Sequence, residues 1–265
     1  MKITLPISEL ITPENYGQIE CDAYEIRGEY YPGIPFLQEL VKTGKPLIYH
    51  ESVGIMKMDF ISRHFGQFLS IVKRFPFLQY SCHFAPACRR YQIKERNGLM
   101  TYQAQLGEKI LSPDEIYKVV ESVVKRMRSK YDGQIALENT NFYPFPEYSY
   151  VCEPDLISKI FRSLDIGFVL DLAHAWITAR NKGMEYEDYL MALPLDKVTE
   201  IHVSEPSLAV CWWKDAHSIP KELQWARLRF LLLKVNDPYV VVEYYGDFDG
   251  IKMCYEKLNE IKREK

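Results

Sequence analysis

Short apolar runs that end abruptly at a histidine or an acidic residue recur along this chain, and helical patterns lie between them. Residues 46–49 lead directly to His50, residues 135–137 lead to Glu138, and residues 168–170 stop at Asp171. Strand patterns that alternate with helical patterns favour a parallel sheet, because each crossover helix returns the chain to the same sheet edge. Side chains at the ends of such strands gather at one edge.

The strand count predicts a closed barrel. The expected strands are 18–24, 46–49, 77–82, 135–137, 168–170, 197–203, 211–214 and 239–242. Eight strands in 265 residues without an evident linker are typical of a single (β/α)8 TIM barrel domain over residues 1–265. The segment between the sixth and seventh runs is too short for a crossover helix, so we expect a loop there. The first run brings Glu20, Asp22 or Glu25 near the strand ends, although salt bridges at the barrel rim explain these acids equally well.

Helical patterns fall between most of these runs. The expected helices are 35–41, 58–74, 113–127, 154–164, 186–193, 221–234 and 249–262. The helix after Ser112 is the clearest, because Ser112 and Glu115 form a capping box around Pro113. Residues 87–111 lack periodicity, which favours a lid or binding loop, with a solvated excursion carrying a small hairpin as the alternative.

Composition limits the class of protein. Hydrophobic residues make up 47% of the chain, enough for a large core. A net charge of −3 gives no electrostatic signature of nucleic-acid binding. The chain starts at Met1 without a secretory pattern, has no apolar run of membrane length, and spreads six cysteines without a C-x-x-C pair. These features predict a soluble cytoplasmic protein with no membrane partner, whose cysteines are reduced core residues.

Five of the six histidines fall at strand ends, in the company of carboxylates. The candidate metal ligands are His50, His83, Glu138, Asp171, His174, His202, Asp215, His217 and Glu243. Any one of them could be a satisfied rim residue, but their convergence on one barrel mouth predicts a metal centre. His64 lies within an expected helix, and we interpret it as structural.

The donor types narrow the choice of metal. Nine nitrogen and oxygen donors exceed what one ion takes, so two or three divalent ions bridged by Glu138 or another carboxylate are expected. Imidazole with carboxylate fits iron, zinc or manganese and disfavours magnesium and calcium. We assign Glu138, Asp215 and Glu243 as candidate catalytic residues, and Asn139, Tyr143 and Arg89 as candidate substrate-binding residues.

The ligand order is similar to that of the xylose-isomerase-like TIM barrels, and most similar to the multinuclear non-heme iron oxidative enzymes of the methanobactin-biosynthesis-like group. The motifs that carry this resemblance are Ser81-x-His83, Glu138-Asn139, Tyr189-Leu190-x-x-Leu193-Pro194-x-x-x-Val198-x-Glu200-Ile201-His202, Asp215-x-His217-x-x-Pro220 and Val242-Glu243. The resemblance implies a di- or tri-iron site that uses dioxygen to modify a peptide, often at cysteine, while a partner protein presents the substrate.

Two departures keep other functions open. His174 stands where the iron group often has asparagine, and Ser204-Glu205-Pro206 replaces a glycine-containing turn. The chain also resembles the endonuclease IV family, which has histidine at the position of His174 and matches all nine ligand types in order. That resemblance implies a zinc phosphodiesterase acting on abasic DNA, for which basic residues between Arg89 and Arg96 would supply phosphate contacts.

Two further alternatives remain. A sugar isomerase or epimerase would use one or two ions to polarise a carbonyl, but this ligand set is richer than such a reaction needs, and no lysine is evident beside it. A non-enzymatic barrel would use its Tyr- and Phe-rich loops to store metal or bind a partner.

Overall fold

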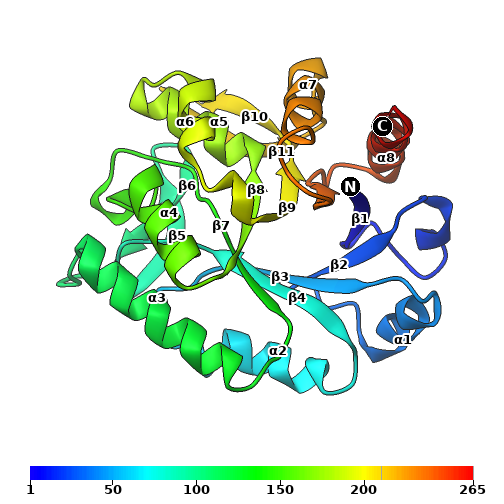
Figure 1. Cartoon of the computed structure of the whole chain (residues 1–265), viewed down its shortest axis with the longest axis horizontal. Helices are drawn as coiled ribbons and strands as arrows, with labels where there is room; N and C mark the ends of the chain where they lie inside the picture. The colour runs from blue at the N-terminus through cyan, green and yellow to red at the C-terminus, as the bar shows by residue number, and fades with distance from the viewer. Residues whose placement is uncertain (210, 265) are drawn as a thin grey trace.

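The computed structural model describes residues 1–209 and 211–264, in which eight parallel strands close into a barrel (Figure 1). These strands are β1 (Lys2–Ile7), β2 (Ala23–Arg27), β3 (Leu47–Gly54), β4 (Phe77–His83), β7 (Gln134–Glu138), β8 (Gly167–Asp171), β9 (Val198–Val203) and β12 (Tyr239–Val242). Neighbouring barrel strands follow chain order, and β12 closes on β1. The expected TIM barrel is confirmed.

Two of the eight predicted strands were wrong. The first barrel strand is β1, which the sequence analysis missed because Pro6 interrupts its apolar pattern. Residues 18–24 mostly precede β2, which starts at Ala23. Residues 211–214 do not enter the barrel, because they belong to a hairpin of β10 (Glu205–Ala209) and β11 (Trp212–Ser218). That hairpin explains why the preceding segment is too short for a crossover.

Helices surround the barrel (Figure 1). They are α1 (Ile34–Lys42), α2 (His64–Val72), α3 (Pro113–Arg128), α4 (Pro154–Ser163), α5 (Leu172–Lys182), α6 (Tyr186–Ala192), α7 (Glu222–Leu231) and α8 (Phe248–Arg263), with short 3-10 helices at Tyr16–Gln18, Pro146–Tyr148 and Leu195–Lys197. The predicted capping box of α3 is present, since the Ser112 hydroxyl accepts from the Glu115 amide and the Glu115 carboxylate accepts from the Ser112 amide. The helix expected from residue 58 starts only at His64.

Helix α5, which begins directly at the end of β8, was not predicted. Asp171 caps its N-terminus by accepting from the His174 amide at 2.6 Å, and Gly183 ends it with a left-handed φ of 70°. Residues on most sides of α5 are buried, so it lacks the one-sided apolar stripe that identifies a surface helix. As a consequence, the cap places Asp171 and His174 together at the barrel mouth.

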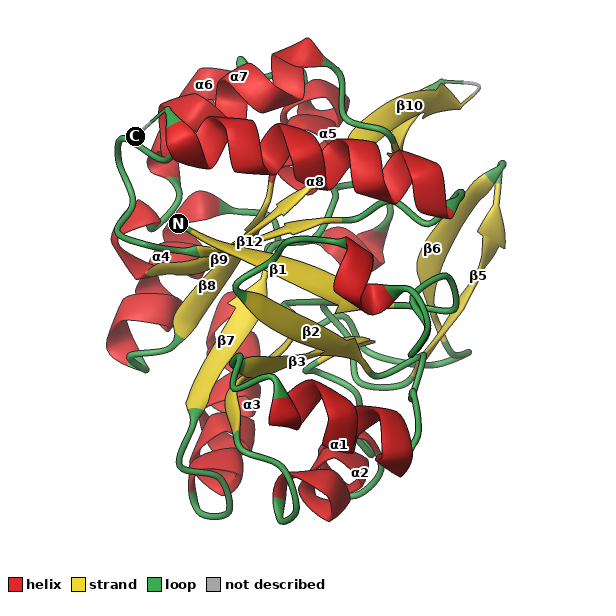
Figure 2. Cartoon of the chain, turned by 90° about the vertical axis from the view of Figure 1, so that its right-hand side faces the viewer, coloured by secondary structure: helices red, strands yellow, loops and turns green. Residues whose placement is uncertain are grey.

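Two antiparallel hairpins extend from the same side of the barrel (Figure 2). One pairs β10 with β11, and the other pairs β5 (Tyr91–Arg96) with β6 (Leu99–Ala104). Residues 87–111 therefore include the small hairpin that we had kept as the alternative. The β5–β6 hairpin is anchored to the molecule through the Tyr102 amide, which donates to the Tyr148 hydroxyl at 3.0 Å.

The cysteines mostly behave as core residues. Cys21, Cys82, Cys88, Cys152 and Cys254 are buried and unpaired, as expected. Cys211 is exposed, contrary to the prediction, because it lies at the turn between β10 and β11 rather than in a barrel strand. Within the described residues, no helix has the length and apolar character required to cross a membrane.

Candidate metal centre

Eight of the nine predicted ligands lie at or just beyond the carboxyl end of a barrel strand or on the adjoining hairpin, whereas His50 lies within β3, which continues to Gly54. Their elements are β3 for His50, β4 for His83, β7 for Glu138, β8 for Asp171, α5 for His174, β9 for His202, β11 for Asp215 and His217, and the residue after β12 for Glu243. The parallel register pairs His83 with Glu138 and Asp171 with His202. The barrel thereby brings together residues almost 200 positions apart.

Glu138 occupies the middle of the cluster. Its Oε2 lies 3.2 Å from His50 Nε2 and 3.4 Å from His83 Nε2. Its Oε1 lies 3.1 Å from His174 Nδ1 and 3.8 Å from His202 Nδ1. Because each oxygen faces a different pair of imidazoles, this carboxylate has the arrangement of a ligand that bridges two ions.

Two ligand groups share Glu138. The first position comprises His50, His83 and Glu138, and the second comprises Glu138, Asp171, His202 and Glu243. Within each group the ligand atoms lie no more than 4.8 Å from one another, a spacing that one divalent ion can span.

A third group lies on the hairpin side of the cluster. The Asp215 Oδ2 atom is 2.6 Å from His217 Nε2 and 3.4 Å from His174 Nε2. His217 Nε2 also lies 3.6 Å from Glu243 Oε2. Glu243 therefore links this third position to the second, as Glu138 links the second to the first.

Unpartnered ligand atoms test whether ions fit this arrangement. The atoms His50 Nε2, Glu138 Oε2, Asp171 Oδ2 and His202 Nδ1 are all buried, and none has a hydrogen-bond partner within the described chain. A buried polar atom without a partner is unfavourable by about 1–3 kcal/mol. Divalent cations would satisfy all four atoms, so the residues present fit a multinuclear metal centre.

The protonation preferences differ across the cluster. Burial lowers the pKa of His50, and it lowers the pKa of His83 to about 4, so both rings present free lone pairs near neutral pH. Burial also disfavours charge on His217, but the Asp215 carboxylate overrides it and raises the pKa to about 10. Burial, reinforced by the Glu243 and Asp215 carboxylates, raises the pKa of Asp171 to about 7. An ion at the first position would therefore displace fewer protons than an ion at the third.

Neighbouring side chains orient the ligands. The His83 Nδ1 atom lies 2.9 Å from the Tyr102 hydroxyl of β6, and the His50 Nδ1 atom lies 3.0 Å from the Ser81 hydroxyl. Asn139 forms two hydrogen bonds with the backbone of Asp171, of 2.9 and 3.0 Å. Such contacts fix which imidazole nitrogen faces the metal and in which direction.

Of the predicted substrate-binding residues, Asn139 lies directly against a predicted ligand. Asn139 is buried and supports Asp171, and Tyr143 is buried with its hydroxyl accepting from Asn141 at 3.1 Å. The Nε atom of Arg89 is buried without a partner among the described residues. Contact of these three residues with substrate stays a prediction.

Three charged residues complete the site. Glu25, which we had considered on a misplaced strand, is fully buried beside His202, whereas Asp22 pairs with Lys262 at the surface. Arg27 and Glu200 were missed. Arg27 lies two residues after Glu25 on β2, and Glu200 lies two residues before His202 on β9. Because residues two apart on a strand point to the same face, both could have been predicted as site residues.

Residues 109–264 match the family described as RiPP precursor modification enzyme MbnB/TglH/ChrH. The chain belongs to this family. Its curated relatives include a UPF0276 protein of Anaeromyxobacter sp. strain Fw109-5, 28% identical over 104 residues that are 39% of this chain and 37% of the relative. A UPF0276 protein of Vibrio parahaemolyticus is 24% identical over 136 residues, 49% of this chain and 47% of the relative. The matches thus span less than half the length of these relatives.

Solved structures share the fold across the whole chain. A D-tagatose 3-epimerase-like protein superposes with a TM-score of 0.66 and 14% identity, covering 100% of this chain and 98% of that one. A xylose isomerase-like TIM barrel protein from Mycobacterium smegmatis, in complex with magnesium, gives a TM-score of 0.66 and 13% identity, covering 99% and 95%. At these identities the likeness establishes a xylose-isomerase-like barrel alone. Family membership supports a metal-dependent enzyme, and the ligand geometry supports a multinuclear site.

Proposed function

We propose that this protein is a two- or three-iron enzyme that uses dioxygen to modify a peptide oxidatively. The observation that carries the proposal is the set of four buried, unpartnered ligand atoms, on His50, Glu138, Asp171 and His202, in a chain of a precursor-peptide modification family. Iron accepts this mixture of imidazole and carboxylate, and manganese or zinc is the alternative. When bound, iron would supply reduction of dioxygen and an open position for a substrate thiolate or amide.

The residues of the chain divide the tasks by their exposure. His202 and Glu138 are almost completely buried, so their role is to hold ions and exclude water. The side chain of His217 is 39% exposed, compared with 17% for His83 and 13% for Asp215, so we propose that substrate reaches the centre on the side of His217 and the β10–β11 hairpin. Of the three predicted catalytic carboxylates, Asp215 is then the one nearest to the substrate.

A groove beside the third position offers a route for a peptide segment. It has a volume of about 250 Å³ and is lined in part by Arg27, Tyr30 and Tyr245. The Tyr245 hydroxyl donates to Glu243 Oε1 at 3.4 Å, and its ring contacts the His217 ring at 5.4 Å between centroids. A side chain that enters this groove therefore approaches the ligands of the third position. We propose that a partner protein presents the peptide.

The experiment begins with anaerobic purification. We expect about two or three iron ions per chain and an absorption spectrum that changes when air is admitted. If a short cysteine-containing peptide is encoded beside the gene, co-expression should change the mass of that peptide with the wild-type chain and not with Glu243→Gln. A chain that carries zinc alone and gives no spectral change in air would overturn the oxidative proposal.

His174 favours one competing function, because the resemblance to endonuclease IV places histidine there. The corresponding assay is nicking of a plasmid that contains abasic sites by the zinc-loaded chain. Nicking that Glu243→Gln abolishes would replace the oxidative proposal with phosphodiester hydrolysis. We expect no nicking, because the net charge of −3 provides no general attraction for a DNA backbone.

A further inference from the structure

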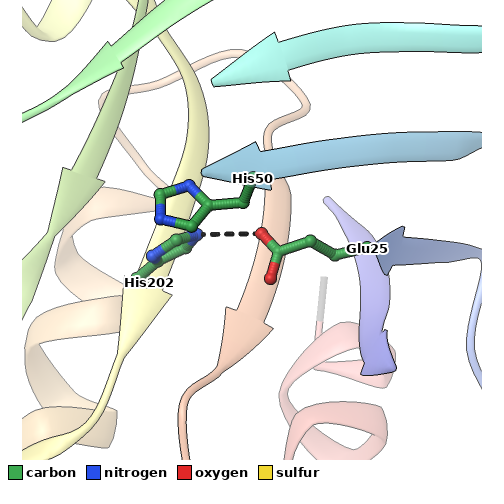
Figure 3. A group of neighbouring side chains, drawn as sticks. All are labelled: Glu25, His50 and His202. Atoms are coloured by element: carbon green, nitrogen blue, oxygen red, sulfur yellow. Dashed lines mark ion pairs between the residues drawn. The ribbon is translucent and has the colours of Figure 1, made fainter. Parts of the chain in front are cut away.

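His202 presents its two nitrogens to opposite sides of the site. The Nδ1 atom is buried without a hydrogen-bond partner and lies 3.5 Å from Glu243 Oε1, facing the second ion position. The Nε2 atom lies 3.1 Å from Glu200 Oε1, its hydrogen-bond partner, and 3.3 Å from Glu25 Oε2, with which it forms an ion pair. Figure 3 shows the pair with Glu25, whose Oε2 atom is buried and has no hydrogen-bond partner among the described residues. A neutral imidazole that binds an ion through Nδ1 carries its proton on Nε2, and a carboxylate beside Nε2 stabilises that form.

The two carboxylates beside Nε2 are engaged differently. The second oxygen of Glu200 accepts from Gln79 Nε2 at 2.6 Å, so Glu200 links His202 to Gln79. The second oxygen of Glu25 instead accepts from Arg27 Nη1 at 3.2 Å. The same Arg27 nitrogen also donates to Oε1 of Glu243.

The geometry of β2 explains how the Glu25 carboxylate contacts both His202 and Arg27. Glu25 and Arg27 are two residues apart on β2, so their side chains project from the same face of that strand into the barrel. Both residues are buried, at 0% and 6% exposure, which removes solvent screening between them. Glu25 thus connects directly to His202 and, through Arg27, to Glu243.

We propose that Glu25 is a positioning residue that holds two ligands of the second ion, His202 and Glu243, in their binding orientation. Glu25 acts on His202 through the ion pair between its Oε2 and the Nε2 atom, and on Glu243 by fixing the guanidinium of Arg27. The inference rests on the metal centre of the proposed function but not on iron, dioxygen or a peptide. A carboxylate in this role typically changes metal affinity by about 10–100-fold.

The alternative role for Glu25 is direct ligation. Its Oε2 atom lies within 4.8 Å of ligand atoms on His50 and His202, close enough for these three to surround a separate ion. That arrangement would require His202 to bind through Nε2 and would leave its Nδ1 atom facing Glu138 and Glu243. The nitrogen of His202 that carries the proton therefore decides between positioning and ligation.

The test uses zinc, because it is diamagnetic and fits the same ligands. The chain is stripped with a chelator and titrated with zinc by calorimetry, and anomalous diffraction from crystals locates each ion. For Glu25→Gln we expect zinc affinity at the second position to fall by about 10–100-fold, while the first position keeps the wild-type affinity. For the matched control Glu200→Gln we expect a change below about tenfold, because the amide oxygen still accepts from His202 Nε2 and because Arg27 and Glu243 stay in place.

A spectroscopic measurement on the wild type keeps the proposal falsifiable even if a variant fails to fold. Long-range ¹H–¹⁵N spectra of the zinc-loaded chain should show His202 protonated on Nε2 and bound through Nδ1. A His202 bound through Nε2, or a Glu25→Gln variant with wild-type zinc affinity at all positions, would overturn the proposal. A wild-type chain that binds no zinc, iron or manganese would instead remove the metal centre, and the proposed function with it.

Discussion

The metal centre has a barrel half, whose ligands stand on barrel strands, and a hairpin half, whose ligands Asp215 and His217 stand on β11. The two halves differ in burial and in how their ligands are held in place. Glu138, Asp171 and His202 stand on barrel strands and are at most 1% exposed, and the parallel register fixes their relative positions. Asp215 and His217 stand on β11, outside the barrel, with side chains 13% and 39% exposed. His217 also has a φ of 43°, a conformation that costs a non-glycine residue about 1 kcal/mol or more.

This difference indicates that the barrel half holds its ligands in a fixed arrangement, whereas the ligands of the hairpin half can adjust their positions. The hairpin joins the rest of the protein through polar contacts, including Asn181, which exchanges two hydrogen bonds with the backbone of Trp213, and through the Trp213 ring, which lies 5.9 Å from that of Trp176. The Ser204 hydroxyl donates to Asp215 Oδ1 at 3.3 Å. We therefore expect the first and second ion positions to be stronger, and the third to fill last and to be the one next to substrate.

Substitution of Glu138 should cause the largest loss of metal affinity, because this residue contributes to both the first and the second ion positions. Glu138→Gln keeps the volume of the side chain but lacks the second anionic oxygen. We expect metal affinity at the first and second positions to fall by on the order of 100-fold or more, beyond the loss typical of a residue that only orients a ligand. Metal content after dialysis, measured by mass spectrometry, checks this. Retention of the full complement of ions would mean that Glu138 bridges nothing.

Substitution of His217 should show that the hairpin half can lose its ion while the barrel half keeps its ions. His217→Ala leaves the barrel ligands intact, so we expect loss of about one ion per chain and loss of activity, with the other ions retained. The matched control is His64→Ala, since His64 lies 3.7 Å from Glu51 at the start of α2 and contributes to none of the three positions. If His217→Ala emptied every position, the hairpin half would not be independent.

Lowering the pH should release the ion at the third position before the ion at the first position. His217 has its pKa raised to about 10 by Asp215 against the effect of burial, so an ion at the third position must displace its proton. Affinity there should fall by about tenfold per pH unit below 10. Burial lowers the pKa of His83 to about 4, so this imidazole opposes binding at the first position only below that pH. Metal content measured from pH 9 to pH 5 should show the third ion lost first, and simultaneous loss would contradict the comparison.

The same contrast separates what the sequence could reveal from what it could not. The barrel ligands could be predicted, because an apolar run that ends in a histidine or an acid marks each strand end, as Asp171 and Glu138 show. The hairpin that carries Asp215 was mistaken for a barrel strand, because a short aromatic run looks the same in both settings. The buried helix α5 lacked a one-sided pattern.

The contacts that orient the ligands were the least predictable. Tyr102 meets His83 across 19 residues of chain through a hairpin that shows no periodicity, and Arg27 reaches Glu243 across 216 residues. Neither pairing leaves a local pattern, because each depends on tertiary packing. The division of nine ligands into three positions likewise depends on distances that only the folded barrel sets.

Removing the Tyr102 hydroxyl should cause the smallest loss of metal affinity. The change tests whether the β5–β6 hairpin contributes to metal binding by the barrel ligands. Tyr102→Phe deletes the partner of His83 Nδ1, so we expect affinity at the first position to fall by about tenfold with the second position unchanged. Tyr91→Phe is the matched control, because the Tyr91 hydroxyl is equally buried on the same hairpin but bonds the Gly54 backbone. Both variants should lose about 1 kcal/mol of unfolding free energy, and only Tyr102→Phe should weaken zinc binding in a calorimetric titration. Equal zinc affinity in the two variants would show that His83 is held by its own strand, and that the β5–β6 hairpin contributes stability alone.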